Sequence, residues 1–178
     1  AGPGITNPSQ KLVAMTFDAM TRTFSNPVVI ADDTGQPATT RPGWPAVFPD
    51  AKSVVFHHQT AAGYDGNGDG ALWTRGGARA HIAWTGVTGT NVTPLNQLNG
   101  LDAAGQSYLP KLAAPKSITC TGDGNTVGNI DADHGNDPTL NYEPTVNPVA
   151  SGGYAWVVFT SRRMYGNLGT LPPFCSDP

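Results

Sequence analysis

Short apolar runs separated by glycine, proline and aspartate turns follow one another along the chain, and this punctuation limits what it can fold into. The sequence holds 22 glycines and 16 prolines, spread along its whole length. Both residues interrupt long helices and favour turns. Apolar residues at helical spacing are scarce, and the one helical candidate, residues 18–23, is too short to be stable without tertiary support. The pattern predicts an all-β fold.

Alternating and β-branched runs mark the expected strands. These are residues 11–17, 28–30, 53–58, 79–87, 92–98 and 154–163. The length of 178 residues suits one domain, so we expect residues 1–178 to form a single all-β unit. Residues 101–140 carry scattered Gly, Pro, Asp and Asn with few apolar pairs, and are predicted to form a long loop or insertion.

The charge content excludes some classes of partner. Charged residues make up 13% of the chain and the formal net charge is −3, so the basic surface needed to neutralise phosphates is not expected and nucleic acid is not an expected partner. No apolar run approaches the ~20 residues that cross a bilayer, so no membrane span is expected. Residues 1–4 lack the features of a signal peptide and fit a mature N-terminus left after processing.

Cysteine usage bears on the compartment. Cys120 and Cys175 have no second cysteine close by, so neither a CxxC redox motif nor a cysteine-rich zinc site is available. A single disulfide between them is the preferred interpretation, and two free buried thiols in a cytosolic protein are the alternative. A disulfide requires an oxidising compartment. Together with the low charge and the abundant Asn, Thr, Gly and Pro, this favours a secreted or periplasmic protein.

An internal repeat is visible in the sequence. Residues 45–49 (PAVFP) and 54–56 (VVF) correspond to residues 144–148 (PTVNP) and 157–159 (VVF). In each copy a proline starts the approach, a second proline opens a turn, and a β-branched pair followed by Phe forms the returning strand. The turn of the second copy is longer than that of the first.

These residues resemble the TolB-type β-propeller repeat, in which a proline and a Ser-Pro-Asp-Gly-Lys turn precede a hydrophobic strand that ends in an aromatic residue. Residues 49–52 (PDAK) keep most of that turn, with Phe48 in place of Ser and Ala51 in place of Gly. Residues 154–163 are similar to the second strand of such a blade. The remaining expected strands then fit the third and fourth strands of the first copy and the end of a preceding blade: 79–87, 92–98, 11–17 and 28–30.

The resemblance implies β-propeller-like blades, one complete and two partial, with a β-sandwich as the alternative fold. Propellers close with about four to eight blades, and a chain of this length is too short for that. The expected partners are therefore other propeller blades, from the same longer chain or from a partner chain. The implied function is an extracytoplasmic binding or scaffold module.

The strongest metal-site signal lies in a glycine-rich loop. Asp65, Asn67 and Asp69 alternate with glycines, an arrangement that presents oxygen ligands to a hard cation. Ca²⁺ is the cofactor this loop would accept, and a bare surface turn is the alternative. Gly76 stands where an EF-hand would have its Glu, so further ligands would have to come from elsewhere.

A second loop carries a denser set of candidate ligands, which are Asp131, Asp133, His134 and Asp137. These groups could bind a divalent ion or transfer protons, although Asp and Gly are also ordinary turn residues.

Other candidates point to ligand binding without a clear reaction. These are His57, His81, Arg162 and Arg163. No G-x-S-x-G elbow and no phosphate-binding glycine loop is present, so no catalytic residue is assigned and the sequence leans against an enzyme. Two alternatives stay open. One is a metal-dependent enzyme or metal-binding protein using His and Asp loop residues, and the other is a carbohydrate-binding β-sandwich.

Overall fold

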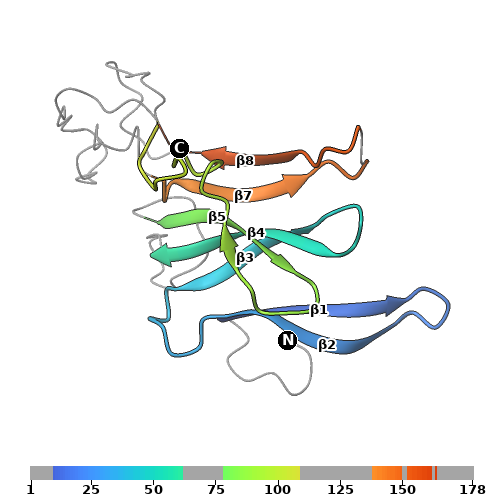
Figure 1. Ribbon diagram of the computed structural model, residues 1–178. Helices are drawn as coiled ribbons and strands as arrows, with labels where there is room; N and C mark the ends of the chain where they lie inside the picture. The colour runs from blue at the N-terminus through green and yellow to red at the C-terminus, as the bar shows by residue number, and fades with distance from the viewer. Residues whose placement is uncertain (1–9, 62–77, 109–137, 150–151, 162, 164–178) are drawn as a thin grey trace, which may run out of the picture.

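The computed structural model describes residues 10–61, 78–108, 138–149, 152–161 and 163 (Figure 1). Within these ranges the chain forms β-strands and no α-helix, so the expected all-β fold is confirmed. The strands are β1 (Lys11–Asp18), β2 (Thr23–Asp32), β3 (Arg41–Val47), β4 (Ser53–Ala61), β5 (Arg79–Gly86), β6 (Thr93–Pro94), β7 (Asn141–Val146) and β8 (Val157–Ser161).

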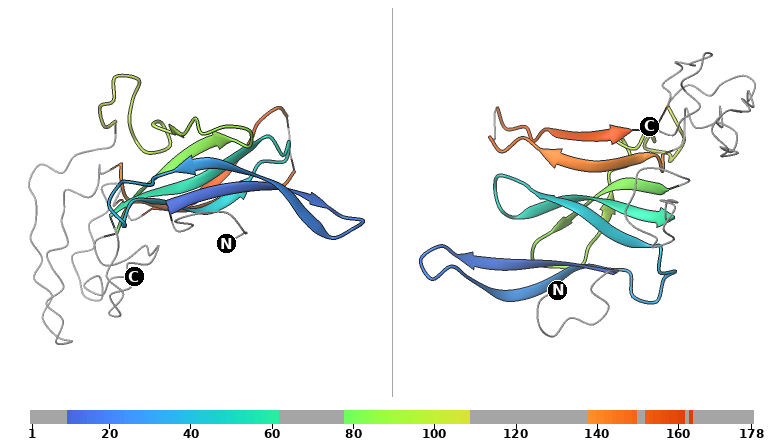
Figure 2. Two further views of the ribbon diagram at one scale, coloured as in Figure 1. Left: turned by 90° about the horizontal axis from the view of Figure 1, so that it is seen from below. Right: turned by 180° about the vertical axis from the view of Figure 1, so that it is seen from behind.

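The strands form three layers. β1 and β2 make one hairpin, β7 and β8 make another, and β3, β4, β5 and β6 form a four-stranded sheet in chain order. All the strand pairings are antiparallel. Figures 1 and 2 show the two hairpins on opposite sides of the four-stranded sheet, which we call the central sheet.

Both faces of β4 are covered, one by each hairpin. Successive side chains of a strand point to opposite faces. Phe56 packs with Ala31 of β2 and Ala83 of β5, so its face is turned toward the β1–β2 hairpin. The neighbouring His57 packs its ring edge-on against Tyr142 of β7, so the other face is turned toward the β7–β8 hairpin. This double coverage explains why the central residues of β4 form a continuous buried run.

The β7 strand is joined to the start of β5. The Ala80 N–H donates to the Thr139 carbonyl at 2.7 Å, and the Tyr142 hydroxyl donates to the Ala78 carbonyl at 2.8 Å. Tyr142, Leu140 and the two alanines form one buried apolar cluster. The apolar contacts and the two hydrogen bonds together hold the second hairpin against the central sheet.

The two copies of the sequence repeat have the same strand register and the same bulge. In β3 the pairing with β4 shifts between Gly43 and Ala46, and in β7 the pairing with β8 shifts between Tyr142 and Thr145. The residue before the proline has a positive φ in each copy, 50° at Trp44 and 51° at Glu143. A bulge with an unusual backbone conformation depends on its surroundings. Its recurrence at the corresponding place confirms that the repeat is structural.

Hydrogen bonds close the turn of each copy in the same way. The Phe48 N–H donates to the Ser53 carbonyl at 3.0 Å, and the Asn147 N–H donates to the Trp156 carbonyl at 3.1 Å. Counted from the shared prolines, Phe48 and Asn147 occupy the same position. The longer second turn therefore leaves the pairing on both sides of it unchanged.

The expected strand over residues 92–98 was wrong in its length. Of these residues only the two of β6 are paired with β5 as a strand, and the chain then leaves the sheet. The reason is Asn99, whose Oδ1 accepts the Ile82 N–H at 2.7 Å and whose Nδ2 donates to the Ile82 carbonyl at 2.8 Å. The Ile82 carbonyl also accepts the Leu95 N–H at 2.9 Å, but the Ile82 N–H, which a longer strand would use, is taken by the Asn99 side chain.

Other boundaries also moved. The helical candidate at residues 18–23 spans the turn of the β1–β2 hairpin, residues 19–22, where the Asp18 Oδ1 accepts the N–H groups of Met20 and Thr21 at 2.8 and 3.2 Å. The strand expected over 28–30 is part of the longer β2, and the one expected over 154–163 is shortened to β8. Of the expected loop 101–140, residues 109–137 lie outside the described ranges.

Candidate functional site

His57 is a buried histidine whose two ring nitrogens are in different situations. Its Nδ1 accepts the Glu143 N–H at 3.2 Å, and only 1% of the residue is exposed. Burial, followed by the nearby charges of His58 and Arg41, lowers the pKa of His57 from 6.5 to about 4. The ring is therefore neutral at pH 7 and carries its proton on Nε2. That nitrogen has no hydrogen-bond partner among the described residues.

Two further polar side chains on the same face are also incompletely paired. Arg41 stands opposite Gln59 in the β3–β4 register, and Gln59 follows His57 at the next position on this face. The Arg41 Nε and both amide atoms of Gln59 are buried and, within the described part of the chain, without a hydrogen-bond partner. Each such group costs about 1–3 kcal/mol if it stays unpaired. We call these three residues the Arg41–His57–Gln59 cluster.

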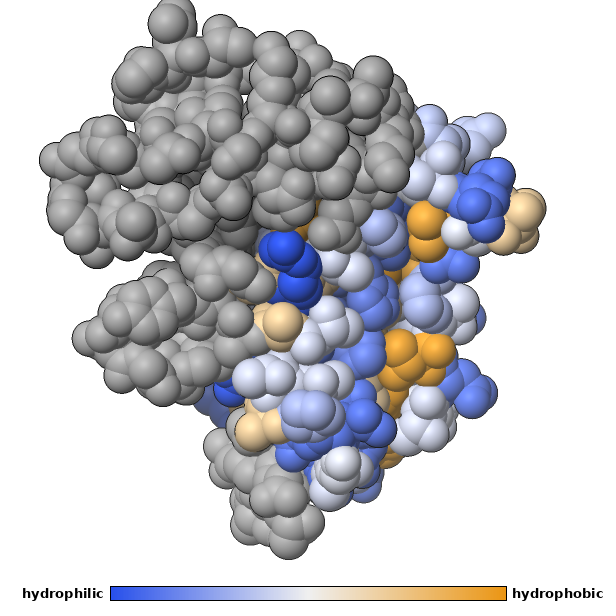
Figure 3. Space-filling view, turned by 90° about the vertical axis from the view of Figure 1, so that its left-hand side faces the viewer, coloured by the Kyte–Doolittle hydropathy of each residue, from blue (hydrophilic) through white to orange (hydrophobic). Residues whose placement is uncertain are grey.

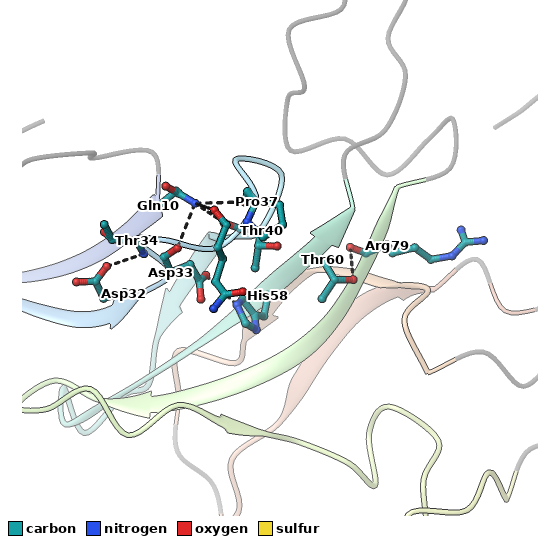
Figure 4. Close-up of polar contacts among 10 residues, drawn as sticks. Gln10, Asp32, Asp33, Thr34, Pro37, Thr40, His58, Thr60 and Arg79 are labelled. Carbon is teal, nitrogen blue, oxygen red and sulfur yellow. Dashed lines mark hydrogen bonds and ion pairs between the residues drawn. The ribbon is translucent and has the colours of Figure 1, made fainter.

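A separate polar group lies on the opposite face of the central sheet. His58 pairs directly with His81 across β4 and β5, with ring centroids 5.1 Å apart. The His58 Nε2 lies 2.8 Å from the Asp33 Oδ2 (Figure 4). Burial, followed by the charge of His58, lowers the pKa of His81 to about 4. His58 is thus the partner of Asp33, beside a histidine, His81, that is neutral at pH 7.

The loop that carries Asp33 is held by Gln10. The Gln10 Nε2 lies within hydrogen-bonding distance of the backbone carbonyls of Asp33, Gln36, Pro37 and Thr40, at 3.1 to 3.4 Å (Figure 4). One amide nitrogen shared among these carbonyls links the start of β1 to the β2–β3 connection. The role of Gln10 is therefore to position the loop.

The structure separates the two histidines that the sequence suggested as ligands. His57 faces the β7–β8 hairpin, whereas His81, paired with His58, faces the β1–β2 hairpin. They do not share a site. No group of three or more His, Cys, Asp or Glu side chains within the described ranges is arranged to hold a metal ion. The adjacency of His57 and His58 indicated opposite faces, but only the β4–β5 register shows which one meets His81.

Arg163 holds a loop in place. Its Nη1 donates to the Asn99 carbonyl at 2.8 Å, its Nη2 to the Leu98 carbonyl at 3.2 Å, and its Nε to the Ser161 Oγ at 3.0 Å. The guanidinium joins the end of β8 to the loop beside β5. The other predicted site residues lie outside the described ranges: Asp65, Asn67, Asp69, Asp131, Asp133, His134, Asp137 and Arg162.

An open groove of about 390 Å³ lies between the turns of the two repeat copies. It is lined by Phe48, Pro49, Asp50, Ser53, Trp84, Gly153, Tyr154 and Ala155. The long turn of the second copy supplies Tyr154, which is 72% exposed. Aromatic rings beside a carboxylate form a surface with both apolar and hydrogen-bonding character. Sequence reasoning missed this groove, although the lengthened second turn was a signal for it.

No helix in the described part of the chain is both long and apolar enough to cross a membrane. Comparison with protein-family models finds no match, and searches of curated proteins and of solved structures find no significant match either. The residues of the chain itself must therefore carry any functional conclusion.

Proposed function

We propose that this chain is a run of β-propeller-type blades that works as an extracytoplasmic binding or scaffold module. The observation that carries the proposal is the repeat, because two strand pairs with one register, one bulge and one type of turn closure pack face to face. Packing of repeated sheets against their neighbours is how propellers bury their faces. The secreted or periplasmic location, and a disulfide between Cys120 and Cys175, belong to the same proposal.

Exposed apolar residues on the outer hairpins support further blades as partners. Val55 of β4 and Val158 of β8 occupy corresponding positions in the two copies. Val55 is fully buried, whereas Val158 is 64% exposed. Val55 shares its face of β4 with His57, and that face is turned toward the β7–β8 hairpin. A further pair of strands, from a longer chain or from a partner chain, would cover Val158 as this hairpin covers Val55.

The groove between the two turns is the proposed ligand-binding surface, and an oligosaccharide is the ligand that suits it best. The apolar face of a sugar ring can stack on Trp84 or Tyr154, while its hydroxyls can donate to the Asp50 carboxylate. The Asp50 Oδ1 already accepts the Lys52 N–H at 2.9 Å, which holds this carboxylate at the groove. Carbohydrate binding, one of the alternatives that the sequence left open, is thus assigned to the turns of the two blades.

Removing the exposed ring of the groove should weaken saccharide binding. We expect a soluble member of a panel of cello-, xylo- and chito-oligosaccharides to bind the wild-type chain in isothermal titration calorimetry. Tyr154→Ala should lower that affinity about tenfold, because an aromatic contact contributes on the order of 1 kcal/mol or more. The exposure of Tyr154 makes its loss harmless to folding.

The matched control is Phe24→Ala, which removes another exposed ring outside the groove. It should leave saccharide affinity unchanged. The groove proposal fails if no saccharide of the panel binds, or if Phe24→Ala weakens binding as much as Tyr154→Ala does.

Calcium remains a proposal for the loop of Asp65, Asn67 and Asp69. A site occupied at about one hundred times its dissociation constant stabilises the folded state by about 2.7 kcal/mol. We therefore expect EDTA to lower the unfolding temperature and excess CaCl₂ to restore it, whereas MgCl₂ restores it poorly. The same measurement on Asp65→Asn combined with Asp69→Asn should show no response to either. An equal response in the double variant would rule out this loop as the site.

A further inference from the structure

The Arg41–His57–Gln59 cluster lies near the end of the strands opposite to the groove. The groove is built from the turn that precedes β4, whereas Gln59 lies close to the end of β4 and Arg41 begins β3. His57 and Gln59 are each 1% exposed. Figure 3 looks onto this end of the strands, where the visible described residues are mostly hydrophilic. The cluster is independent of the groove and of the propeller interpretation.

The cluster has more hydrogen-bond donors than acceptors. Because the His57 Nδ1 is occupied as an acceptor by the Glu143 N–H, its Nε2 is a donor. The Arg41 Nε–H is a donor, and the Gln59 amide has a donor nitrogen and an acceptor oxygen. If Arg41 donated to that oxygen, the His57 Nε2–H and the Gln59 amide nitrogen would still need an acceptor. Exchanging the two amide atoms of Gln59 leaves the same excess.

The charge of the cluster is positive. Arg41 contributes a guanidinium cation. The ion pairs of the described ranges join Lys11 to Asp32 and His58 to Asp33, and neither includes Arg41. An acceptor with a single negative charge therefore complements the cluster in both hydrogen bonding and charge, whereas a metal cation would oppose Arg41.

We propose that the Arg41–His57–Gln59 cluster binds a small carboxylate. Its two oxygens accept hydrogen bonds from Arg41, His57 and Gln59, and its charge balances the guanidinium. A carboxylate suits this set because it is acceptor-only when ionised and offers several lone-pair directions within one small group. The ligand class is thus a compact organic acid or the carboxylate end of a larger molecule.

Titration of the wild-type chain with sodium acetate tests the proposal directly. The ring nitrogens of His57 are followed by ¹⁵N NMR at pH 7 and assigned by their loss in His57→Gln, with NaCl keeping the ionic strength constant. We expect a saturable shift of the His57 Nε2 resonance with acetate and none with added chloride. The absence of a saturable shift in the wild-type chain would overturn the proposal and leave water as the occupant of the cluster.

Variants identify the residues that hold the ligand. Arg41→Met and Gln59→Met should each weaken acetate binding about tenfold or more, because hydrogen bonds to a charged group are the stronger ones. Lys52→Met and Gln36→Met, which alter exposed side chains elsewhere, should leave it unchanged. Acetate affinity that survives both cluster variants would overturn the proposal, as would tighter binding of sodium phosphate than of acetate. Unfolding curves of each variant establish that it is folded under the titration conditions.

Discussion

Replacing Phe56 with alanine is expected to lower the free energy of unfolding by roughly 3–5 kcal/mol, the range for removing a fully buried aromatic side chain. Phe56 is 0% exposed and packs with Ala31 of the β1–β2 hairpin and Ala83 of β5. Its loss therefore opens a cavity at the contact between two layers of the fold. Urea unfolding followed by circular dichroism measures the effect. The slope of the free energy of unfolding against urea concentration should be the same in the variant and the wild-type chain.

The repeat supplies a matched control for this prediction. Phe159 of β8 follows the same β-branched pair as Phe56 but is only half-buried. Phe159→Ala should therefore cost less, roughly 1–2 kcal/mol, because less apolar surface returns to water. Equal effects of the two substitutions would contradict the layer arrangement, in which the first copy is covered on both faces and the second is not.

Mild acid is expected to destabilise the protein through His57. The pKa of His57 is lowered from 6.5 to about 4 in the folded chain, so between these pH values the unfolded chain binds more protons than the folded one. The contribution of His57 to the free energy of unfolding is fully present above pH 6.5. It is lost as the pH is lowered toward 4, by about 3 kcal/mol in total. The lowered pKa of His81 acts in the same direction. Unfolding by urea at a series of pH values measures the loss.

His57→Gln separates this contribution from the others. The substitution removes the titrating ring, so the variant should lose less stability between pH 6.5 and 4 than the wild-type chain does. Its stability at pH 7 is compared separately, because the hydrogen bond from Glu143 changes as well. If the free energy of unfolding fell equally with pH in the two proteins, the folded chain would accept a proton on His57 without cost, contrary to its burial.

The sequence contained enough information for the strands and the repeat. Turn residues around β-branched runs located β1, β4 and β5 within a few residues, because local backbone preferences and alternation act over short distances. The repeat of residues 45–49 at 144–148 corresponds to a shared bulge and register. The length predicted for the strand at residues 92–98 was wrong because the side chain of Asn99, beyond β6, takes the Ile82 N–H that a longer strand would use.

The candidate sites depended on register, which the sequence does not show. His57 was a predicted ligand residue, but its neighbours Arg41 and Gln59 were not, because they meet only through the β3–β4 pairing. Trp84 and Tyr154 are far apart in the chain and line one groove only because the two repeat copies are stacked. Arg163 was predicted to bind an anionic ligand, and its hydrogen bonds to backbone carbonyls of the loop beside β5 depend on contacts that the sequence does not show.

The sequence by itself determined that this chain is an all-β protein with a repeated strand pair, since turn chemistry and side-chain alternation are local properties of the backbone. Tertiary structure decided which face each histidine occupies. His57 became a neutral, buried donor beside an arginine, whereas the adjacent His58 became the ion-pair partner of Asp33. The reason is that a β-strand turns successive residues to opposite faces, and only the packing of the two hairpins against the central sheet gives each face its own partners.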